Sequence, residues 1–248
     1  MKKIILGLLF FNTMIMNAQT QIIAHRGFWK TNPETTENSI TALKNAQRLG
    51  VYGSEFDVRM TKDGFLVVNH DEHHGKMEIS ETNFDDLNSI KLENGENLPK
   101  LEDYLKQGLK NKKVKLIVEI KPAKTKELED EIVAKSLKII KDLKLEKQCE
   151  FISFSLNICK EIKHKEPKFI VQYLNGELSP QELKNENLDG LDYHYNVLLN
   201  NPTWISDAKK LGLITNSWTV NDENIYQQLK KMGIDFITTN IPEILKNK

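Results

Sequence analysis

Hydrophobic and polar positions follow two alternating patterns from residue 114 to the C-terminus. Short apolar runs typical of buried strands are separated by stretches in which apolar residues recur with the period of a helix. The pattern predicts strands at 114–120, 150–154, 168–174, 188–193, 213–218 and 235–239. It predicts helices at 126–145, 155–165, 179–185, 202–211 and 222–232. Strands that alternate with helices at this spacing indicate parallel βα units.

The first half of the chain adds strand candidates at 21–24, 53–59 and 65–70, and short helices at 83–90 and 101–109. A further helix is expected to begin with Asn38 or Ser39 as its cap and to end at Gly50. The strand candidates then number nine. This is one more than an eight-stranded α/β barrel contains.

The surplus strand is 65–70, because only the tight turn around Asp63-Gly64 separates it from the strand before it. A parallel neighbour requires a crossover of about a dozen residues or more, and no such stretch lies between Val58 and Phe65. This strand must therefore return antiparallel. The sequence predicts a distorted (β/α)₈ TIM-type barrel with an extra β-hairpin after the second strand.

The first eighteen residues have the pattern of a secretory signal. Lys2-Lys3 precedes the apolar run 4–11, and cleavage is expected after Ala18. The apolar run is too short for a membrane-spanning helix, and no cysteine follows it to carry a lipid, so we expect no stable membrane anchor. The alternative is a buried first helix. We expect residues 1–18 to be a signal peptide and 19–248 to form a single barrel domain, exported to the periplasm or secreted.

Composition narrows the choice of partner. The 35 basic and 35 acidic residues give a net charge of zero, so the chain lacks the basic field that nucleic-acid binding requires. Arginine occurs only at positions 26, 48 and 59, which makes Arg26, beside His25, a candidate for anion recognition. Cys149 and Cys159 are expected to be buried free thiols. Nothing in the sequence indicates the oligomeric state.

Two pairs of polar residues occupy strand positions two apart, so each pair leaves its strand by one face. Glu55 and Asp57 form the first pair and Glu119 and Lys121 the second. In a barrel of this kind the working groups lie at the C-terminal ends of the strands, so the three carboxylates should converge at one mouth. They would repel one another strongly without a cation between them. Oxygen ligands favour Mg²⁺ or Ca²⁺.

The mouth should also receive His25 and Arg26 after the first strand, His70 from the hairpin and Trp218 from the seventh strand. Arg26 and Lys121 would then offer positive charge to an anionic substrate. His194, near the end of the sixth strand, fits either the mouth or a loop.

Each assignment has a structural alternative. Residues 53–59 also fit a half-exposed strand, and 119–121 a solvated strand end. His25 and His70 could be structural histidines, and Trp218 a core residue. His73, His74 and His164 are expected to be solvated.

The same residues resemble the signature of the glycerophosphodiester phosphodiesterase family, over essentially the whole chain after residue 18 and in order. The matching segments are His25-Arg26-Gly27, Glu37-Asn38-Ser39, Glu55-Phe56-Asp57-Val58, Thr61-Lys62-Asp63-Gly64, His70-Asp71, Glu119-Ile120-Lys121, Ser153-Phe154, Trp218-Thr219-Val220-Asn221-Asp222 and Thr238 to Pro242. The resemblance implies a distorted (β/α)₈ barrel and hydrolysis of glycerophosphodiesters, small-molecule substrates, to glycerol 3-phosphate and an alcohol.

The resemblance also implies roles for individual residues. His25 and His70 would be the general base and the general acid, an order that the sequence itself leaves open. One divalent cation, Ca²⁺ or Mg²⁺, would bind to Glu55, Asp57 and Glu119. The phosphate would contact Arg26 and Lys121, and Trp218 would contact the substrate. The nucleophile would be water or the neighbouring glycerol 2-hydroxyl.

The chain departs from the family pattern at two places near the mouth. Thr36-Glu37-Asn38-Ser39 stands where Pro-Glu-Asn-Thr is usual, and the segment after Asp71 differs from the usual continuation. These changes leave open which alcohol is recognised. Two other functions remain as alternatives. One is a phospholipase acting on lysophospholipid or phosphatidylinositol, which the polar loops 31–36 and 72–80 disfavour. The other is an inactive barrel that serves as a binding protein, which would be expected to lack a histidine or a ligand.

Overall fold

Eight parallel strands close into a barrel in the structure, a computed structural model that describes residues 19–31 and 33–248. β1 (Gln21–Ala24) closes the barrel because it pairs with both β2 (Gly53–Met60) and β11 (Phe236–Thr239). The other barrel strands are β6 (Lys115–Ile120), β7 (Cys149–Ser153), β8 (Val171–Tyr173), β9 (Gly190–His194) and β10 (Ile214–Trp218). The predicted (β/α)₈ barrel is confirmed.

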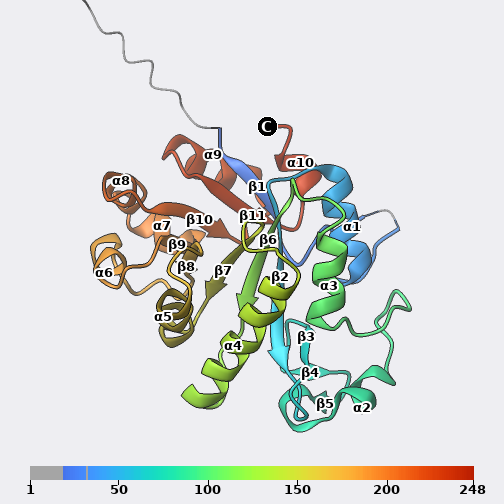
Figure 1. The fold of residues 1–248 in the computed structure, drawn as a ribbon. Coiled ribbons are helices and arrows are strands. Elements are labelled where there is room, and N and C mark those ends of the chain that lie inside the picture. The colour runs from blue at the N-terminus through green and yellow to red at the C-terminus, as the bar shows by residue number, and fades with distance from the viewer. Residues whose placement is uncertain (1–18, 32) are drawn as a thin grey trace, which may run out of the picture.

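Helices surround the barrel and cover its outer face (Figure 1). They are α1 (Ile40–Leu49), α3 (Leu101–Gly108), α4 (Lys126–Asp142), α5 (Leu156–Lys165), α6 (Pro180–Asn185), α7 (Tyr195–Asn200), α8 (Trp204–Lys210), α9 (Glu223–Lys231) and α10 (Pro242–Leu245). Local sequence sets several of their ends. Ser39 caps α1 by accepting from the Ala42 amide, and Gly50 ends α1 in the left-handed conformation. Ser179 caps α6 in a capping box with Glu182.

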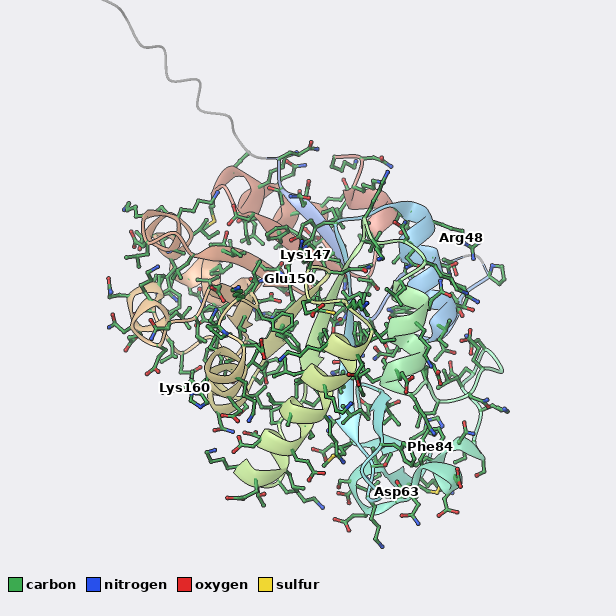
Figure 2. All side chains as sticks on the ribbon, in the orientation of Figure 1. Arg48, Asp63, Phe84, Lys147, Glu150 and Lys160 are labelled. Atoms are coloured by element: carbon green, nitrogen blue, oxygen red, sulfur yellow. The ribbon has the colours of Figure 1, made fainter. Side chains whose placement is uncertain are left out.

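The extra strand β3 (Leu66–Val68) pairs antiparallel with β2, with Val58 opposite Val68, as predicted. The chain then forms a small insertion of β4 (His73–His74), β5 (Met77–Glu78), a 3₁₀ turn (Ile79–Glu81) and α2 (Phe84–Asn88). The insertion projects from one side of the barrel (Figure 1) and has its own apolar cluster around Val67. Asp63, in the turn between β2 and β3, accepts from the Phe84 amide of α2 at 3.0 Å, and Figure 2 shows both residues on this side of the molecule, away from Glu150.

Side chains alternate between the two faces of the barrel wall. Phe56 and Val58 of β2 point outward into the core beneath the helices, whereas Glu55 and Asp57 point inward. Ile23, Ile117, Ile152 and Leu174 form an apolar cluster inside the barrel. The interior is therefore filled by side chains, and polar groups collect at the C-terminal ends of the strands.

Several boundaries differ from the prediction. The strand expected at 168–174 is only β8, Val171–Tyr173, and the one expected at 65–70 is only β3. The helices α7 and α10 and the hairpin β4–β5 were not expected. His74 was expected to be solvated but is buried, and its Nε2 lies 3.0 Å from the Ile90 carbonyl oxygen. Cys149 and Cys159 are buried free thiols, as predicted.

The predicted signal peptide lies outside the described residues. Within 19–31 and 33–248, no helix is long and apolar enough to cross a membrane.

Candidate active site

A cavity of about 190 Å³ opens at the C-terminal ends of the barrel strands. Seven of the eight predicted site residues line it: His25, Arg26, Glu55, His70, Glu119, Lys121 and Trp218. The eighth, Asp57, lies against Lys121, with Lys121 Nζ 2.8 Å from Asp57 Oδ1. The structure thus brings the predicted residues to one end of one barrel.

The carboxylates of Glu55, Asp57 and Glu119 are buried, and one oxygen from each lies within 4.8 Å of the others. Glu55 and Asp57 are each 1% exposed, so β2 is not the half-exposed strand that was the alternative. Glu119 and Lys121 are buried as well, so the segment 119–121 is not a solvated strand end. Glu55 Oε1 has no hydrogen-bond partner. A buried oxygen donor set with an unsatisfied atom fits a hard divalent cation.

The three carboxylates differ in their affinity for protons. Burial, together with the negative charges of Asp57 and Glu119, raises the pKa of Glu55 well above its usual range. Burial and the charge of Asp57 raise the pKa of Glu119 to about 7. Burial acts in the same direction on Asp57, but the charges of Lys121 and His70 and the hydrogen bonds from Lys121 and Asn38 together outweigh it and lower the pKa of Asp57 to about 2. Without a cation, protons compensate part of the repulsion.

Two basic side chains reach the carboxylates. Lys121 Nζ lies 2.6 Å from Glu119 Oε1 and 2.8 Å from Asp57 Oδ1. Arg26 donates from Nη1 to Glu37 at 2.7 Å, and its buried Nε has no hydrogen-bond partner. Both side chains line the cavity, so both can meet an anion there.

The ring of His25 is oriented by a residue at the far end of the chain. His25 Nδ1 lies 2.7 Å from Asn240 Oδ1, and since an amide oxygen only accepts, Nδ1 carries the proton. Nε2 is then the free acceptor, 4.0 Å from Glu55 Oε2. Burial, reinforced by the charge of Arg26, lowers the pKa of His25 to about 4. The neutral imidazole is the form that accepts a proton.

His70 has a different partner. Its Nδ1 lies 2.7 Å from Asp71 Oδ1, and its carbonyl accepts from Arg59 Nε at 2.9 Å. Burial lowers the pKa of His70, while the charge of Asp57 and the hydrogen bond that Nδ1 donates to Asp71 oppose that change. The carboxylate partner favours the imidazolium form more than the neutral Asn240 does for His25. The two histidines therefore lie in unequal environments.

The segment Glu37-Asn38-Ser39 supports the site through three consecutive contacts. Glu37 binds Arg26, and Ser39 caps α1. Asn38 Nδ2 donates to Asp57 Oδ2 at 2.8 Å, and Asn38 Oδ1 accepts from the Asp57 amide. Sequence reasoning considered Asn38 only as a helix cap and missed this role. Its place in the family signature was the signal that could have revealed it.

Gly27 allows the loop after β1 to lie against α1. Its φ is +79°, and a Cβ there would lie 2.7 Å from Ala42 Cβ and 2.8 Å from the Ala42 carbonyl carbon. In this position the Arg26 amide donates to Glu55 Oε2 at 2.8 Å. A residue without a side chain thus fixes Arg26 beside the carboxylates.

The opposite side of the cavity is mainly apolar. Phe154 and Trp218 pack edge to face with ring centroids 5.4 Å apart, and Leu174 lies beside them in the lining. Trp218 Nε1 donates to the Asp192 carbonyl at 2.9 Å. His194 ends β9, contacts the Trp218 ring and caps α7, and it does not line the cavity. Asn240, Phe154 and Asp192 are further residues at the site that were not predicted.

Comparison with known proteins identifies the fold and the family together. A model of the glycerophosphoryl diester phosphodiesterase family matches residues 25–244. The chain belongs to this family. A glycerophosphodiester phosphodiesterase from Caldanaerobacter subterraneus subsp. tengcongensis is 31% identical, over 92% of this chain and 97% of that relative.

Solved structures of related phosphodiesterases have the same fold. The crystal structure of a glycerophosphodiester phosphodiesterase from Parabacteroides distasonis is 45% identical with a TM-score of 0.91, covering 93% of this chain and 96% of that one. A phosphodiesterase from Oleispira antarctica, solved in complex with the product sn-glycerol-3-phosphate, shares the fold with a TM-score of 0.79. It is 23% identical and covers 92% of this chain and 96% of that one.

Proposed function

We propose that the protein hydrolyses glycerophosphodiesters to glycerol 3-phosphate and an alcohol, using one divalent cation, Ca²⁺ or Mg²⁺. The observation that carries this proposal is the buried group of Glu55, Asp57 and Glu119, which shares one barrel mouth with two histidines and two basic side chains. Family membership and the names of the relatives support the substrate class. The glycerol-3-phosphate bound to the Oleispira antarctica neighbour supports the product.

Glu55, Asp57 and Glu119 would hold the cation. When bound, it would supply positive charge that offsets the charge building on the phosphate in the transition state. Arg26 and Lys121 act in the same sense, because both line the cavity and can donate to the phosphate.

His25 is the proposed general base. The hydrogen bond to Asn240 holds the proton on Nδ1 and leaves the lone pair of Nε2 free. Burial keeps the ring neutral at pH 7, which is the required state. Nε2 would take a proton from either water or the neighbouring 2-hydroxyl of the substrate glycerol, and so activate it as the nucleophile.

His70 is the proposed general acid, which protonates the leaving alkoxide. Asp71 accepts from Nδ1 and stabilises the imidazolium that must exist before transfer. Trp218 and Phe154 would pack against the carbon atoms of the substrate on the opposite side of the cavity. The different partners of the two histidines thus support this order of roles.

The two alternative functions have less support. Among the described residues, only Phe65 and Ile244 are large exposed apolar side chains, which does not favour a lipid-binding rim. The proposed catalytic and ligand residues are all present and brought together, which does not favour an inactive barrel.

The test is to incubate the protein with glycerophosphocholine, with and without EDTA, and to measure glycerol 3-phosphate. We expect release that EDTA abolishes and that Ca²⁺ or Mg²⁺ restores. The proposal fails if none of several glycerophosphodiesters gives metal-dependent release.

We also propose that the protein is exported and acts in the periplasm or outside the cell, on the evidence of Lys2-Lys3 and the apolar run after it. Mass spectrometry of the N-terminus of protein recovered from cells is the test. Recovery of the chain with its first eighteen residues intact would contradict export by cleavage.

A further inference from the structure

Asp192 is a buried carboxylate that the proposed mechanism does not use. It lies on β9, where Leu191 and Tyr193 point outward into the core under the helices, so Asp192 points into the barrel. It is 1% exposed, and neither of its side-chain oxygens has a hydrogen-bond partner. It lines the same cavity as His25 and Glu119.

A carboxylate in this position is costly for the fold. Burial, together with the charge of Glu119, raises the pKa of Asp192 well above its usual range. The Asn216 amide opposes this change but does not lie in hydrogen-bonding geometry. An unpaired buried polar group destabilises a protein whether it is charged or neutral, and such groups are few in native structures. A carboxyl group offers an acceptor oxygen in either protonation state.

The two sides of the cavity around Asp192 differ in charge. The charged residues of the mechanism come from β1, β2, β6 and the hairpin. The lining residues from the other strands are Ile152, Phe154, Leu174, Trp218, Thr219, Thr238 and Asp192. Asp192 is the only ionisable group among them, and apart from the two threonines the other residues of this wall are apolar.

Asp192 is also separate from the cation site. The group of carboxylates close enough to share an ion contains Glu55, Asp57 and Glu119 but not Asp192. The cavity of about 190 Å³ is smaller than the ~300–1,000 Å³ of sites for drug-sized ligands. It can therefore enclose only one small arm of a phosphodiester, and the other arm must extend outside.

We propose that Asp192 is a specificity-determining residue that accepts a hydrogen bond from a hydroxyl of the substrate's glycerol, while Phe154 and Trp218 pack against the glycerol carbons. This inference rests on the proposed function and adds which arm of the diester enters the barrel. An acceptor without a partner in the free protein gains one when a polyol enters. A substrate arm without a hydroxyl leaves the Asp192 carboxyl without a partner, so Asp192 does not strengthen its binding.

The experiment compares Asp192→Leu and Asp192→Asn with the wild type on three substrates. Glycerophosphocholine and glycerophosphoinositol share the glycerol but differ in the charge of the alcohol. Bis(p-nitrophenyl) phosphate has the diester but no glycerol. Gln172→Leu is the matched control, because Gln172 is also 1% exposed with an unpaired side-chain oxygen on the adjacent strand but does not line the cavity.

We expect Asp192→Leu to lose at least ~10-fold in kcat/KM on both glycerophosphodiesters, mainly through KM, with a smaller loss for Asp192→Asn. Activity on bis(p-nitrophenyl) phosphate should be unchanged or higher. Gln172→Leu should match the wild type on all three substrates. The melting temperature of Asp192→Leu should equal or exceed that of the wild type, because the variant removes an unpaired buried carboxyl group.

Parallel losses on all three substrates, a fall in melting temperature, or unchanged activity on the glycerophosphodiesters would each overturn the inference. A loss confined to glycerophosphocholine would also overturn it, since Asp192 would then recognise the ammonium group. Failure of the proposed function looks different. The wild type itself would then release no glycerol 3-phosphate from either glycerophosphodiester.

Discussion

Lys121 Nζ lies 2.6 Å from Glu119 Oε1 and 2.8 Å from Asp57 Oδ1, so a lysine bridges two of the three carboxylates proposed to hold a cation. Opposite charge in a buried site explains the contacts, and it raises the pKa of Lys121 against the effect of burial. A bound cation would compete with this ammonium for the same oxygens. The lysine would then be available to a phosphate in the cavity that it lines.

Replacing Lys121 should separate catalysis from cation binding. We expect Lys121→Met to lose about 10²–10³-fold in kcat, the size of effect found when one fixed transition-state donor is removed. Its affinity for Ca²⁺ should be equal or higher, because the competing ammonium is gone. Calorimetric titration and steady-state kinetics measure the two effects.

Lys124→Met is the matched control, since Lys124 is exposed and pairs with Glu78 and Glu81 outside the cavity. This variant should retain wild-type kcat. A loss of Ca²⁺ affinity in Lys121→Met that parallels the loss of activity would contradict a direct role on the phosphate.

Cation binding should strengthen as the pH rises. In the free protein the pKa of Glu119 is about 7, above the usual value of 4.5, so Glu119 holds a proton at pH 6. A cation binds the deprotonated carboxylate, so binding releases this proton below pH 7 and affinity falls as the pH falls. The Glu119 proton alone should change the affinity for Ca²⁺ or Mg²⁺ by up to ~10-fold per pH unit below 7, and the raised pKa of Glu55 should add to this dependence.

Calorimetric titration of the protein with Ca²⁺ at pH 5.5, 6.5 and 7.5 measures this dependence. Glu119→Gln should bind more weakly and show a flatter dependence on pH, because the titrating group is gone. An affinity for the wild type that does not vary between these values of pH would contradict the raised pKa.

The two histidines should respond differently to the leaving group. His25→Ala and His70→Ala should each abolish hydrolysis of glycerophosphocholine and leave the melting temperature within a few degrees of the wild type. On bis(p-nitrophenyl) phosphate, whose leaving group needs little protonation, His70→Ala should regain activity but His25→Ala should not. Initial rates on both substrates measure this. The reverse pattern would exchange the assigned roles, and activity of either variant on glycerophosphocholine would refute its role.

Gly27 should be intolerant of a side chain. Gly27→Ala would place a methyl group within 2.8 Å of Ala42 in a left-handed conformation, so we expect a loss of more than ~2 kcal/mol in the free energy of unfolding. Gly95→Ala is the matched control, because Gly95 also has a positive φ, +82°, but nothing within 4 Å of its Cβ position. Gly95→Ala should lose only about 1–2 kcal/mol, which is the cost of a left-handed backbone for a residue with a Cβ. Denaturant unfolding measures both, and equal losses would contradict the close contact with α1.

The barrel and its charged residues could be predicted because both depend on local rules. The alternation of strands and helices, and the impossibility of a parallel crossover within the Asp63-Gly64 turn, determine the topology. The two-residue spacing of Glu55 and Asp57 places both on one face of β2 in any strand. Since the C-terminal ends of parallel strands meet at one rim, Glu119 of β6 is expected beside Glu55 and Asp57.

The supporting residues could not be predicted from local patterns, because their roles depend on contacts across the closed barrel. Asn38 and Asn240 are separated from Asp57 and His25 by 19 and 215 residues, and no local pattern relates them. Asp192 looks from the sequence like any polar residue in a buried strand. Helix α7 is short and is capped by His194, an uncommon cap, so its formation depends on packing rather than on local signals.

The hydrogen bond between His25 and Asn240 has a consequence for how the enzyme matures. Residue 240 is synthesised 215 residues after residue 25, and β1 lacks its partner β11 until Phe236–Thr239 has been made. A chain released before that point would contain every proposed ligand of the cation and both histidines, yet nothing would orient His25. With His25 as the proposed base, catalytic competence would be acquired only once Asn240 has been made and β11 has closed the barrel.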